Sequence, residues 1–118
     1  IAYAIACDIH PLNNLRVLDY LRRAFGADPQ AVATWFRHWA TETMAPVEAM
    51  LKRSSATGRY AGGETPGLAD LCLYAQVHSN RRFQVDMEPY PTVSRIFAEL
   101  DCLPAFSAAA PERQHDAE

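Results

Sequence analysis

The sequence predicts an all-α domain, a bundle of about five helices around a central buried helix. Three observations indicate this fold class. Apolar residues recur at spacings of three and four, proline and glycine fall between the periodic segments, and no stretch alternates as a strand does. The length of 118 residues corresponds to a single domain, which we assign to residues 1–118.

The first helix is predicted from the start of the chain to Phe25. Pro11 should bend or interrupt it near His10, because proline has no N–H to donate. Gly26 is expected to end it. The opening segment IAYAIACDI has the character of a helix interior without a cap, so we interpret the chain as a fragment that begins inside a helix. The apolar face of this helix consists of Ile5, Ile9, Leu12, Leu15, Leu18, Leu21 and Phe25.

The second helix is predicted to begin at Asp28 and Pro29, as the N-cap and the first helical residue. Its apolar residues continue at helical spacing, and Pro46 is an expected kink. They are Val32, Phe36, Trp39, Val47, Met50 and Leu51. Residues 54–67 contain four glycines and no helical period, which predicts a loop.

The third helix, predicted over residues 67–79, carries the most informative pattern of the chain, GLADLCLYAQVHS. Asp70 stands three residues after Gly67, where a carboxylate can accept from the N-cap amide, so we assign Asp70 a structural role. Because glycine replaces the usual N-cap hydroxyl, only half of this capping box can form. A helix without a polar stripe is expected in the middle of a bundle. Its apolar residues include Leu68, Leu71, Leu73, Tyr74 and Val77.

Two arginines, Arg81 and Arg82, follow this helix. Either they interact with its last carbonyl groups, or one of them is a fixed cation at the rim of an anion pocket. A loop is predicted over about residues 83–90. Pro91 should open a fourth helix and Pro104 a last short one. The inward positions of the fourth helix are Val93, Ile96, Phe97 and Leu100.

Composition excludes several functions. The net charge of −3 gives no basic field for nucleic acid, and no apolar run approaches the roughly 20 residues of a membrane span. The three cysteines, Cys7, Cys72 and Cys102, are widely spaced and odd in number. This favours reduced thiols in a cytoplasmic protein over disulfides or a zinc site. No metal site is predicted, because no metal-ligand spacing occurs.

A second polar cluster lies in CDIHPLNNLR, residues 7–16. It places His10, Asn14 and Arg16 about one helical turn apart on the bent first helix. From the residues alone, this is either a polar stripe facing solvent or a set of donors directed at one point.

Several runs in this order resemble the C-terminal helical domain of zeta-class glutathione transferases, the maleylacetoacetate and maleylpyruvate isomerases. The runs are ACDIHPLNNLRVLDYL, LADLCL, AQV, RRFQVD, EPYPT and LPAFSAAAPERQHDA. The resemblance covers nearly the whole chain. It implies a cytoplasmic, homodimeric enzyme whose own N-terminal thioredoxin-like domain, absent from this chain, carries most of the glutathione site. No catalytic residue is therefore expected in this fragment, which should be inactive alone.

The resemblance also implies roles for individual residues. His10, Asn14, Leu15 and Arg16 would border the glutathione site, and Arg82 would bind a carboxylate of the dianionic substrate, with Arg16 as a second substrate-binding residue. The implied reaction is cis–trans isomerisation of a maleyl double bond by addition and elimination of glutathione, in tyrosine or aromatic-compound catabolism. Two alternatives stay open: a general glutathione transferase, or a non-catalytic helical protein-interaction module.

Overall fold

The computed structural model describes residues 1–115, and these confirm the predicted all-α class. Within them, the only pairing of strand type is an isolated bridge between Tyr60 and Gly63. None of the described helices is both long and apolar enough to cross a membrane. The elements are η1 (Ala4–Ile9), α1 (His10–Asn13), α2 (Leu15–Phe25), α3 (Pro29–Arg53), α4 (Leu68–Arg82), α5 (Pro91–Asp101), α6 (Pro104–Ala108) and η2 (Pro111–Arg113).

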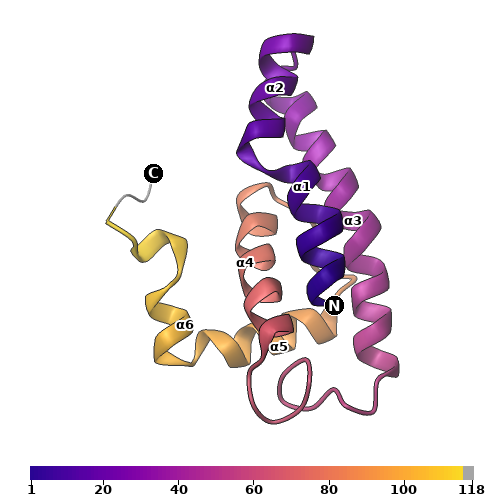
Figure 1. Ribbon diagram of the computed structural model, residues 1–118, viewed down its shortest axis with the longest axis vertical. Coiled ribbons are helices and arrows are strands. Elements are labelled where there is room, and N and C mark those ends of the chain that lie inside the picture. Colours follow the sequence, from indigo (N-terminus) through magenta and orange to yellow (C-terminus); the bar gives the residue numbers. More distant parts are fainter. Residues whose placement is uncertain (116–118) are drawn as a thin grey trace.

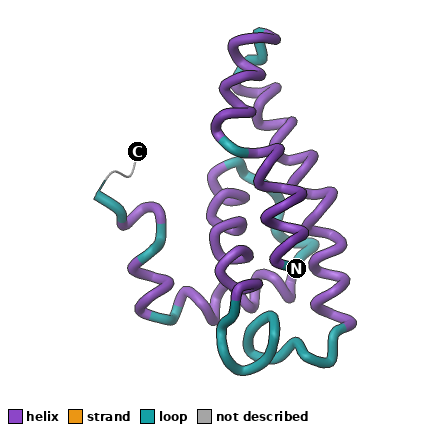
Figure 2. Tube along the Cα trace, in the orientation of Figure 1, coloured by secondary structure: helices purple, strands orange, loops and turns teal. Residues whose placement is uncertain are grey.

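The helices form an elongated bundle of 46 × 34 × 23 Å. The rod made by η1, α1 and α2 packs along α3, α4 lies beside this pair, and α5 crosses one end of the bundle (Figure 1). Helix α5 contacts both α3 and α4, and α6 follows from its end. Figure 2 shows the loop of residues 54–67 at the same end, between α3 and α4.

The core consists of two clusters of buried side chains. The larger one fills the space between η1, α3, α4 and α5, and the smaller one lies between α2 and α3. Each large side chain in them stabilises the fold by about 1.5–3 kcal/mol. The larger cluster includes Ile5, Ile9, Met44, Val47, Leu51, Leu73, Val77, Val93, Ile96, Phe97 and Leu100. The smaller cluster contains Leu18, Val32, Phe36, Ala40 and Val85.

The predicted first helix is divided, and its sharp break lies at Asn14 instead of near His10. A π-helical segment precedes Pro11, in which the His10 N–H donates to the carbonyl of Ile5. Asn14 is extended (ψ 158°) and caps α2, accepting from the Val17 N–H at 3.1 Å. The local capping strength of asparagine therefore places the break three residues after Pro11.

This break changes the face that α2 buries. Leu18 is fully buried as predicted, but Leu15 and Phe25 are 65% and 71% exposed. The prediction of one continuous apolar face was wrong at these two positions, because the extended backbone at Asn14 rotates α2 relative to α1. Gly26 ends α2 as predicted, in the left-handed conformation with φ 64°.

Helix α3 begins as predicted, with the Asp28 carboxylate accepting from the Ala31 N–H at 2.8 Å. It continues through Pro46 without a break in the helix. Pro46 lies on the exposed side, where water can hydrogen-bond the carbonyl group that proline leaves without a donor.

The start of α4 confirms the structural assignment of Asp70. This carboxylate is 1% exposed and accepts from the N–H groups of Gly67 at 2.9 Å and Ala61 at 2.8 Å. Gly67 contributes no side chain, so half of the capping box forms. The bond to Ala61 is an addition that the sequence did not indicate, and it ties the preceding loop to the helix.

Two expectations for α4 were wrong. The helix continues to Arg82, three residues beyond its predicted end, so both arginines belong to its last turn. Its side chains are also not covered all round. Leu73 is fully buried, but Leu68 and Leu71 are 66% and 57% exposed. Residues 1–115 leave the face of α4 that carries Leu68 and Leu71 uncovered.

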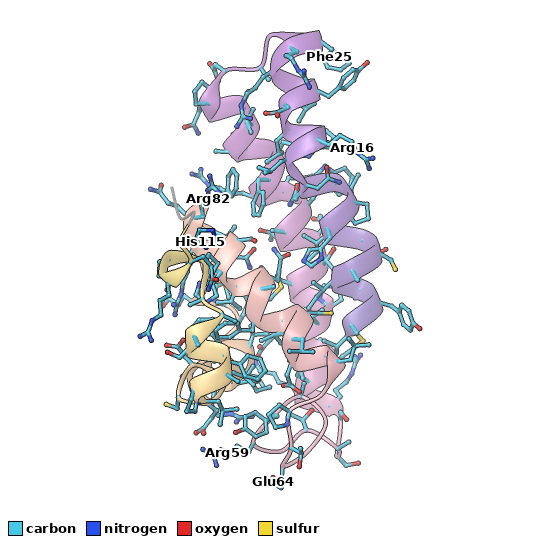
Figure 3. The ribbon with its side chains drawn as sticks, turned by 60° about the vertical axis from the view of Figure 1, so that its left-hand side comes forward. Arg16, Phe25, Arg59, Glu64, Arg82 and His115 are labelled. Atoms are coloured by element: carbon cyan, nitrogen blue, oxygen red, sulfur yellow. The ribbon has the colours of Figure 1, made fainter. Side chains whose placement is uncertain are left out.

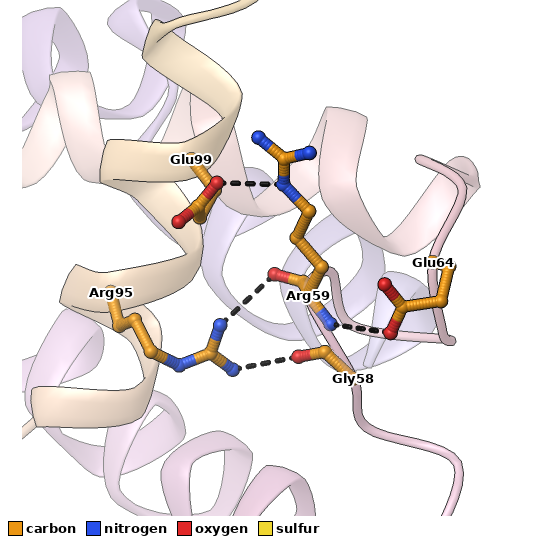
Figure 4. Close-up of polar contacts among 5 residues, drawn as sticks. All are labelled: Gly58, Arg59, Glu64, Arg95 and Glu99. Carbon is orange, nitrogen blue, oxygen red and sulfur yellow. Dashed lines mark hydrogen bonds and ion pairs between the residues drawn. The ribbon is translucent and has the colours of Figure 1, made fainter.

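The loop of residues 54–67 is held in place by α5 (Figure 4). The Arg95 guanidinium donates to the carbonyls of Arg59 at 3.0 Å and Gly58 at 2.9 Å, and the Arg59 Nε pairs with Glu99 at 2.7 Å. A Cβ on Gly58 would stand 2.5 Å from the Glu64 Oε1 and 3.1 Å from the Gly63 backbone, so a side chain there would displace the Glu64 carboxylate and crowd the Gly63 peptide.

Helix α5 begins at Pro91 as predicted, but its N-terminus is capped from α3. The buried Glu48 carboxylate accepts from the N–H groups of Thr92 at 3.0 Å and Val93 at 2.9 Å. Lys52, one turn further along α3, lies 3.2 Å from the same carboxylate. This cap joins two helices that are more than 40 residues apart in sequence.

Candidate functional site

A cavity of about 450 Å³ lies where the break at Asn14 faces the last turns of α4. Its volume falls within the range of small-molecule sites, roughly 300–1,000 Å³. The lining combines one charged group, several amides and an apolar wall. The lining residues are His10, Asn13, Asn14, Leu15, Leu18, Phe36, Gln76, Ser79, Arg82 and Phe83.

Two stacked aromatic rings contribute to the apolar wall of the cavity. Phe36 of α3 and Phe83, which follows α4, have centroids 3.9 Å apart and an interplanar angle of 7°. Arg37 donates from Nε to the Phe83 carbonyl at 2.9 Å and so fixes the chain just after α4. The end of α4 is thereby held at a set distance from α3.

The opposite side of the cavity is fixed by two hydrogen bonds from the break to α3. The Asn13 amide donates to the Phe36 carbonyl at 3.0 Å, and the Trp35 indole donates to the Leu12 carbonyl at 3.0 Å. The Asn13 Oδ1 is buried and has no partner among the described residues. These two bonds attach the backbone just before Asn14 to α3.

His10 lines the cavity together with the buried amides of Asn13 and Gln76. Burial lowers the pKa of its imidazole below the ordinary value, and a hydrogen bond with the Gln76 side chain opposes this shift without cancelling it. Burial therefore favours the neutral form of the ring. Gln76 in turn donates from Nε2 to the Asn80 Oδ1 at 2.6 Å.

The two arginines of α4 have different surroundings. Arg82 lines the cavity, and among the described residues no carboxylate forms an ion pair with it. Arg81 instead lies over the Phe97 ring of α5, with its guanidinium carbon 4.2 Å from the ring centroid. Arg82 is thus the cation available to a ligand in this cavity.

The structure brings together four of the five residues predicted to form the site: His10, Asn14, Leu15 and Arg82. Arg16 is exposed and does not line the cavity. Figure 3 shows Arg16 and Arg82 on opposite sides of the molecule in that view. The roles assigned to all five residues by resemblance stay predictions.

Sequence reasoning missed part of the lining, namely Asn13, Leu18, Phe36, Gln76, Ser79 and Phe83. One signal was available. Gln76 and Asn80 are amides four residues apart in α4, which places them on one face of the helix. Phe36 and Phe83 gave no such signal. A phenylalanine that packs in the core and one that faces a cavity occur at the same apolar positions of the sequence pattern.

A second hollow, of about 350 Å³, lies on α3 alone. It is lined by Thr34, Arg37, His38, Thr41 and Glu42. Because all its residues come from one helix, it brings together no groups from different elements, and we assign it no role.

Comparison with known proteins gives relatives that match nearly the whole chain. The chain is 47% identical to a maleylpyruvate isomerase of Ralstonia sp over 116 residues, 98% of this chain and 55% of that protein. Its fold matches a holo maleyl pyruvate isomerase, described as a bacterial zeta-class glutathione transferase, with a TM-score of 0.95 and 46% identity, covering 99% of this chain and 55% of that one.

A third relative has ligands in its active site. The maleylacetoacetate isomerase of Anaeromyxobacter dehalogenans 2CP-1, solved with bound dicarboxyethyl glutathione and citrate, matches with a TM-score of 0.87 and 34% identity over 99% of this chain and 51% of that one. No family model matches the chain. The chain spans about half the length of these relatives.

The helical bundle therefore has the fold of a glutathione transferase C-terminal domain. Within that class, the chain corresponds in sequence and in structure to the C-terminal helical domain of the zeta-class enzymes, as its motifs predicted.

Proposed function

We propose that the chain is the substrate-binding helical domain of a glutathione-dependent cis–trans isomerase of maleylpyruvate or maleylacetoacetate. The observation that carries this proposal is the position of Arg82. Arg82 lines a cavity together with His10 and Asn14, while the Arg81 guanidinium lies over the Phe97 ring. A cation with no acidic partner among the described residues, beside an apolar wall, is suited to a ligand with carboxylates and a conjugated chain.

Arginine fits this role because its planar guanidinium binds a carboxylate through two parallel hydrogen bonds and stays charged. In the proposed enzyme, Arg82 holds one carboxylate of the dianionic substrate. The stacked rings of Phe36 and Phe83 lie beside the same cavity and exclude water from the conjugated part. A water-poor site strengthens the interaction between Arg82 and the carboxylate.

The residues of the cavity also fit glutathione, which has amide, ammonium and carboxylate groups. His10, Asn14 and Leu15 form the edge of the cavity at the helix break, where an imidazole and an asparagine side chain can bind a peptide. The related enzyme that binds dicarboxyethyl glutathione supports this assignment. When bound, glutathione supplies the thiolate nucleophile. Arg16 could contribute only from outside this cavity.

We further propose that an N-terminal thioredoxin-like domain completes the site and activates the thiol. The length of the relatives supports this, because the chain spans about half of each. The exposed Leu68 and Leu71 offer such a domain an apolar surface to pack against. By the same relationship, we propose a cytoplasmic homodimer that acts in tyrosine or aromatic-compound catabolism.

Turnover of the whole protein tests the proposal. With glutathione present, it should convert maleylpyruvate or maleylacetoacetate to the fumaryl isomer, and without glutathione it should not. Conjugation of chlorodinitrobenzene without isomerisation would indicate a general glutathione transferase. Absence of both activities would contradict an enzymatic role and favour a protein-interaction module.

A further inference from the structure

The backbone turn directly after Arg82 has an unusual conformation. The N–H of Gln84 donates to the carbonyl of Arg81 at 3.1 Å, and the N–H of Val85 donates to the carbonyl of Asn80 at 2.9 Å. These two bonds form a Schellman motif, in which the position of Gln84 is left-handed and is usually glycine. Gln84 has a φ of 55°, the only positive value at a residue other than glycine among residues 1–115.

A left-handed conformation costs free energy at glutamine that it does not cost at glycine. Such backbone persists where the surrounding contacts determine it, and it is frequent at binding sites. This turn adjoins the cavity, because Arg82 and Phe83, the two residues before Gln84, both line it. The contacts that hold the turn are therefore candidates for a role in the site.

Three contacts with other elements hold this turn. The Phe83 ring stacks on Phe36, and the Val85 side chain is buried in the smaller core cluster. The third contact is a directional hydrogen bond, from the Arg37 Nε to the Phe83 carbonyl at 2.9 Å. The last carbonyl groups of a helix have no partner within the helix, and a cation is favourable at that end of the helix dipole. Arg37 therefore fixes the peptide group that lies one residue after Arg82.

We propose that Arg37 is a positioning residue for Arg82: by holding the end of α4 against α3, it sets where the Arg82 guanidinium meets a carboxylate of the maleyl substrate. Arg37 is not among the residues that line this cavity, so it acts through the backbone of α4. An arginine that binds a carboxylate through two parallel bonds must be placed accurately, and a misplacement of about 1 Å can cost about a hundredfold in rate. The inference rests on the proposed function for its substrate, but not for the contact between Arg37 and the turn.

Steady-state kinetics of the whole protein test the proposal with Arg37→Met, which removes the donor and keeps a long side chain. We expect the KM for the maleyl substrate to rise about tenfold, the effect of one weakened charged hydrogen bond. The value of kcat should change less than about twofold, because the placement of Arg82 serves the ground and transition states alike. Arg37→Lys, which keeps a charged donor, should recover part of the loss. Arg53→Met, the same substitution at the exposed end of α3, is the matched control and should leave KM unchanged.

The KM for glutathione provides a comparison within the same variant. Its proposed contacts, His10, Asn14 and Leu15, lie at the helix break, which is attached to α3 by other hydrogen bonds. Arg37→Met should therefore change the KM for glutathione less than about twofold. An equal rise in both KM values would overturn the proposal, because it would indicate a general loosening of the cavity.

Two double variants separate positioning from lost stability. In an Arg82→Ala background, Arg37→Met should have no further effect on the KM for the maleyl substrate, and an equal rise in both backgrounds would overturn the proposal. Gln84→Gly relieves the left-handed glutamine, so alone it should raise the denaturation midpoint and leave KM unchanged. Combined with Arg37→Met, it should recover the midpoint while KM stays high. A KM that returned together with the midpoint would show that Arg37 acts only through stability.

Amide hydrogen exchange gives a readout that does not depend on activity. In Arg37→Met, exchange of the Gln84 and Val85 N–H groups should be about tenfold faster, because the turn opens more often. Exchange of the Val93 N–H, which donates to Glu48 at the start of α5, should not change. Unchanged exchange at Gln84 and Val85 would refute the positioning role. If the unmodified protein has no isomerase activity, the proposed function fails, whereas the exchange rates still decide whether Arg37 fixes the end of α4.

Discussion

At the scale of single residues, the contrast between Arg81 and Arg82 gives the sharpest test of the site. Replacing Arg82 with alanine in the whole protein should lower kcat/KM by about ten- to a hundredfold. The variant loses a charged hydrogen bond worth roughly 1.5–3 kcal/mol. Because this bond is made in the ground state and in the transition state alike, the effect should appear mainly in KM. Arg82→Lys should recover only part of this, because a point charge cannot form both parallel bonds. Steady-state kinetics with varied maleyl substrate measure both effects.

Arg81→Ala is the matched control for this experiment. It removes the contact with the Phe97 ring, so it should lower stability by about 0.5–1 kcal/mol and leave KM unchanged. The reverse result, with Arg81 essential and Arg82 dispensable, would show that the wrong arginine has been assigned to the substrate.

At the scale of the elements, the start of α4 depends on Asp70. Because this buried carboxylate accepts from Gly67 and Ala61, Asp70→Ala should lower the free energy of unfolding by about 2 kcal/mol or more. Gly67→Ser should raise it by a few tenths of a kcal/mol, since a Cβ there would meet Asp70 at an ordinary 4.0 Å. Urea denaturation of the chain measures both changes.

Asp19→Ala provides the comparison for these two variants. Asp19 pairs with Arg22 on the exposed face of α2, and such surface pairs contribute between about 0 and 1 kcal/mol. Equal denaturation midpoints for the Asp19 and Asp70 variants would contradict the capping role.

The element boundaries that could be predicted are those set by local chemistry. Gly26, Asp28, Pro91 and Pro104 each begin or end a helix in the structure as they do in the prediction, because capping and proline effects depend on a few neighbouring residues. The break at Asn14 is also local. It was missed because Pro11 offered a simpler interruption nearby.

Features that depend on distant residues could not be read from the sequence. The capping of α5 by Glu48 joins residues 45 positions apart, and the Phe36–Phe83 wall joins two segments through tertiary packing. Among the site residues, His10, Asn14, Leu15 and Arg82 were found through family resemblance. For residues 7–16, which include His10 and Asn14, the residues alone left both a solvent-facing stripe and a set of convergent donors open, because helical periodicity does not show which polar groups converge.

At the scale of the whole molecule, the open face of α4 governs behaviour in solution. Because Leu68 and Leu71 are exposed and apolar patches favour association, the 118-residue chain studied alone should self-associate at high concentration. Leu71→Glu should reduce this association, whereas Ala98→Glu on the exposed side of α5 should not. Sedimentation velocity over a range of concentrations distinguishes the variants. A monomer at every concentration would show that this face needs no cover.

The Glu48 cap also makes the junction of α3 and α5 sensitive to acid. Burial would raise the pKa of Glu48, but the N–H of Val93, the hydroxyl and N–H of Thr92, and Lys52 together outweigh it and hold the pKa below the ordinary 4.5. Because the pKa is lower in the folded state, the contribution of Glu48 to stability is complete above pH 4.5 and is lost as the pH falls through the folded-state value.

Glu48→Gln should therefore lower the free energy of unfolding by about 1–3 kcal/mol at pH 7, and its difference from the unmodified chain should shrink below pH 4.5. Glu42→Gln, on the exposed side of the same helix, should show no such trend, and a constant difference for Glu48→Gln from pH 3 to 7 would contradict the linkage. In an acidifying solution, the end of the bundle where α5 crosses α3 should then be the first part to loosen, before the opposite end where α2 packs on α3.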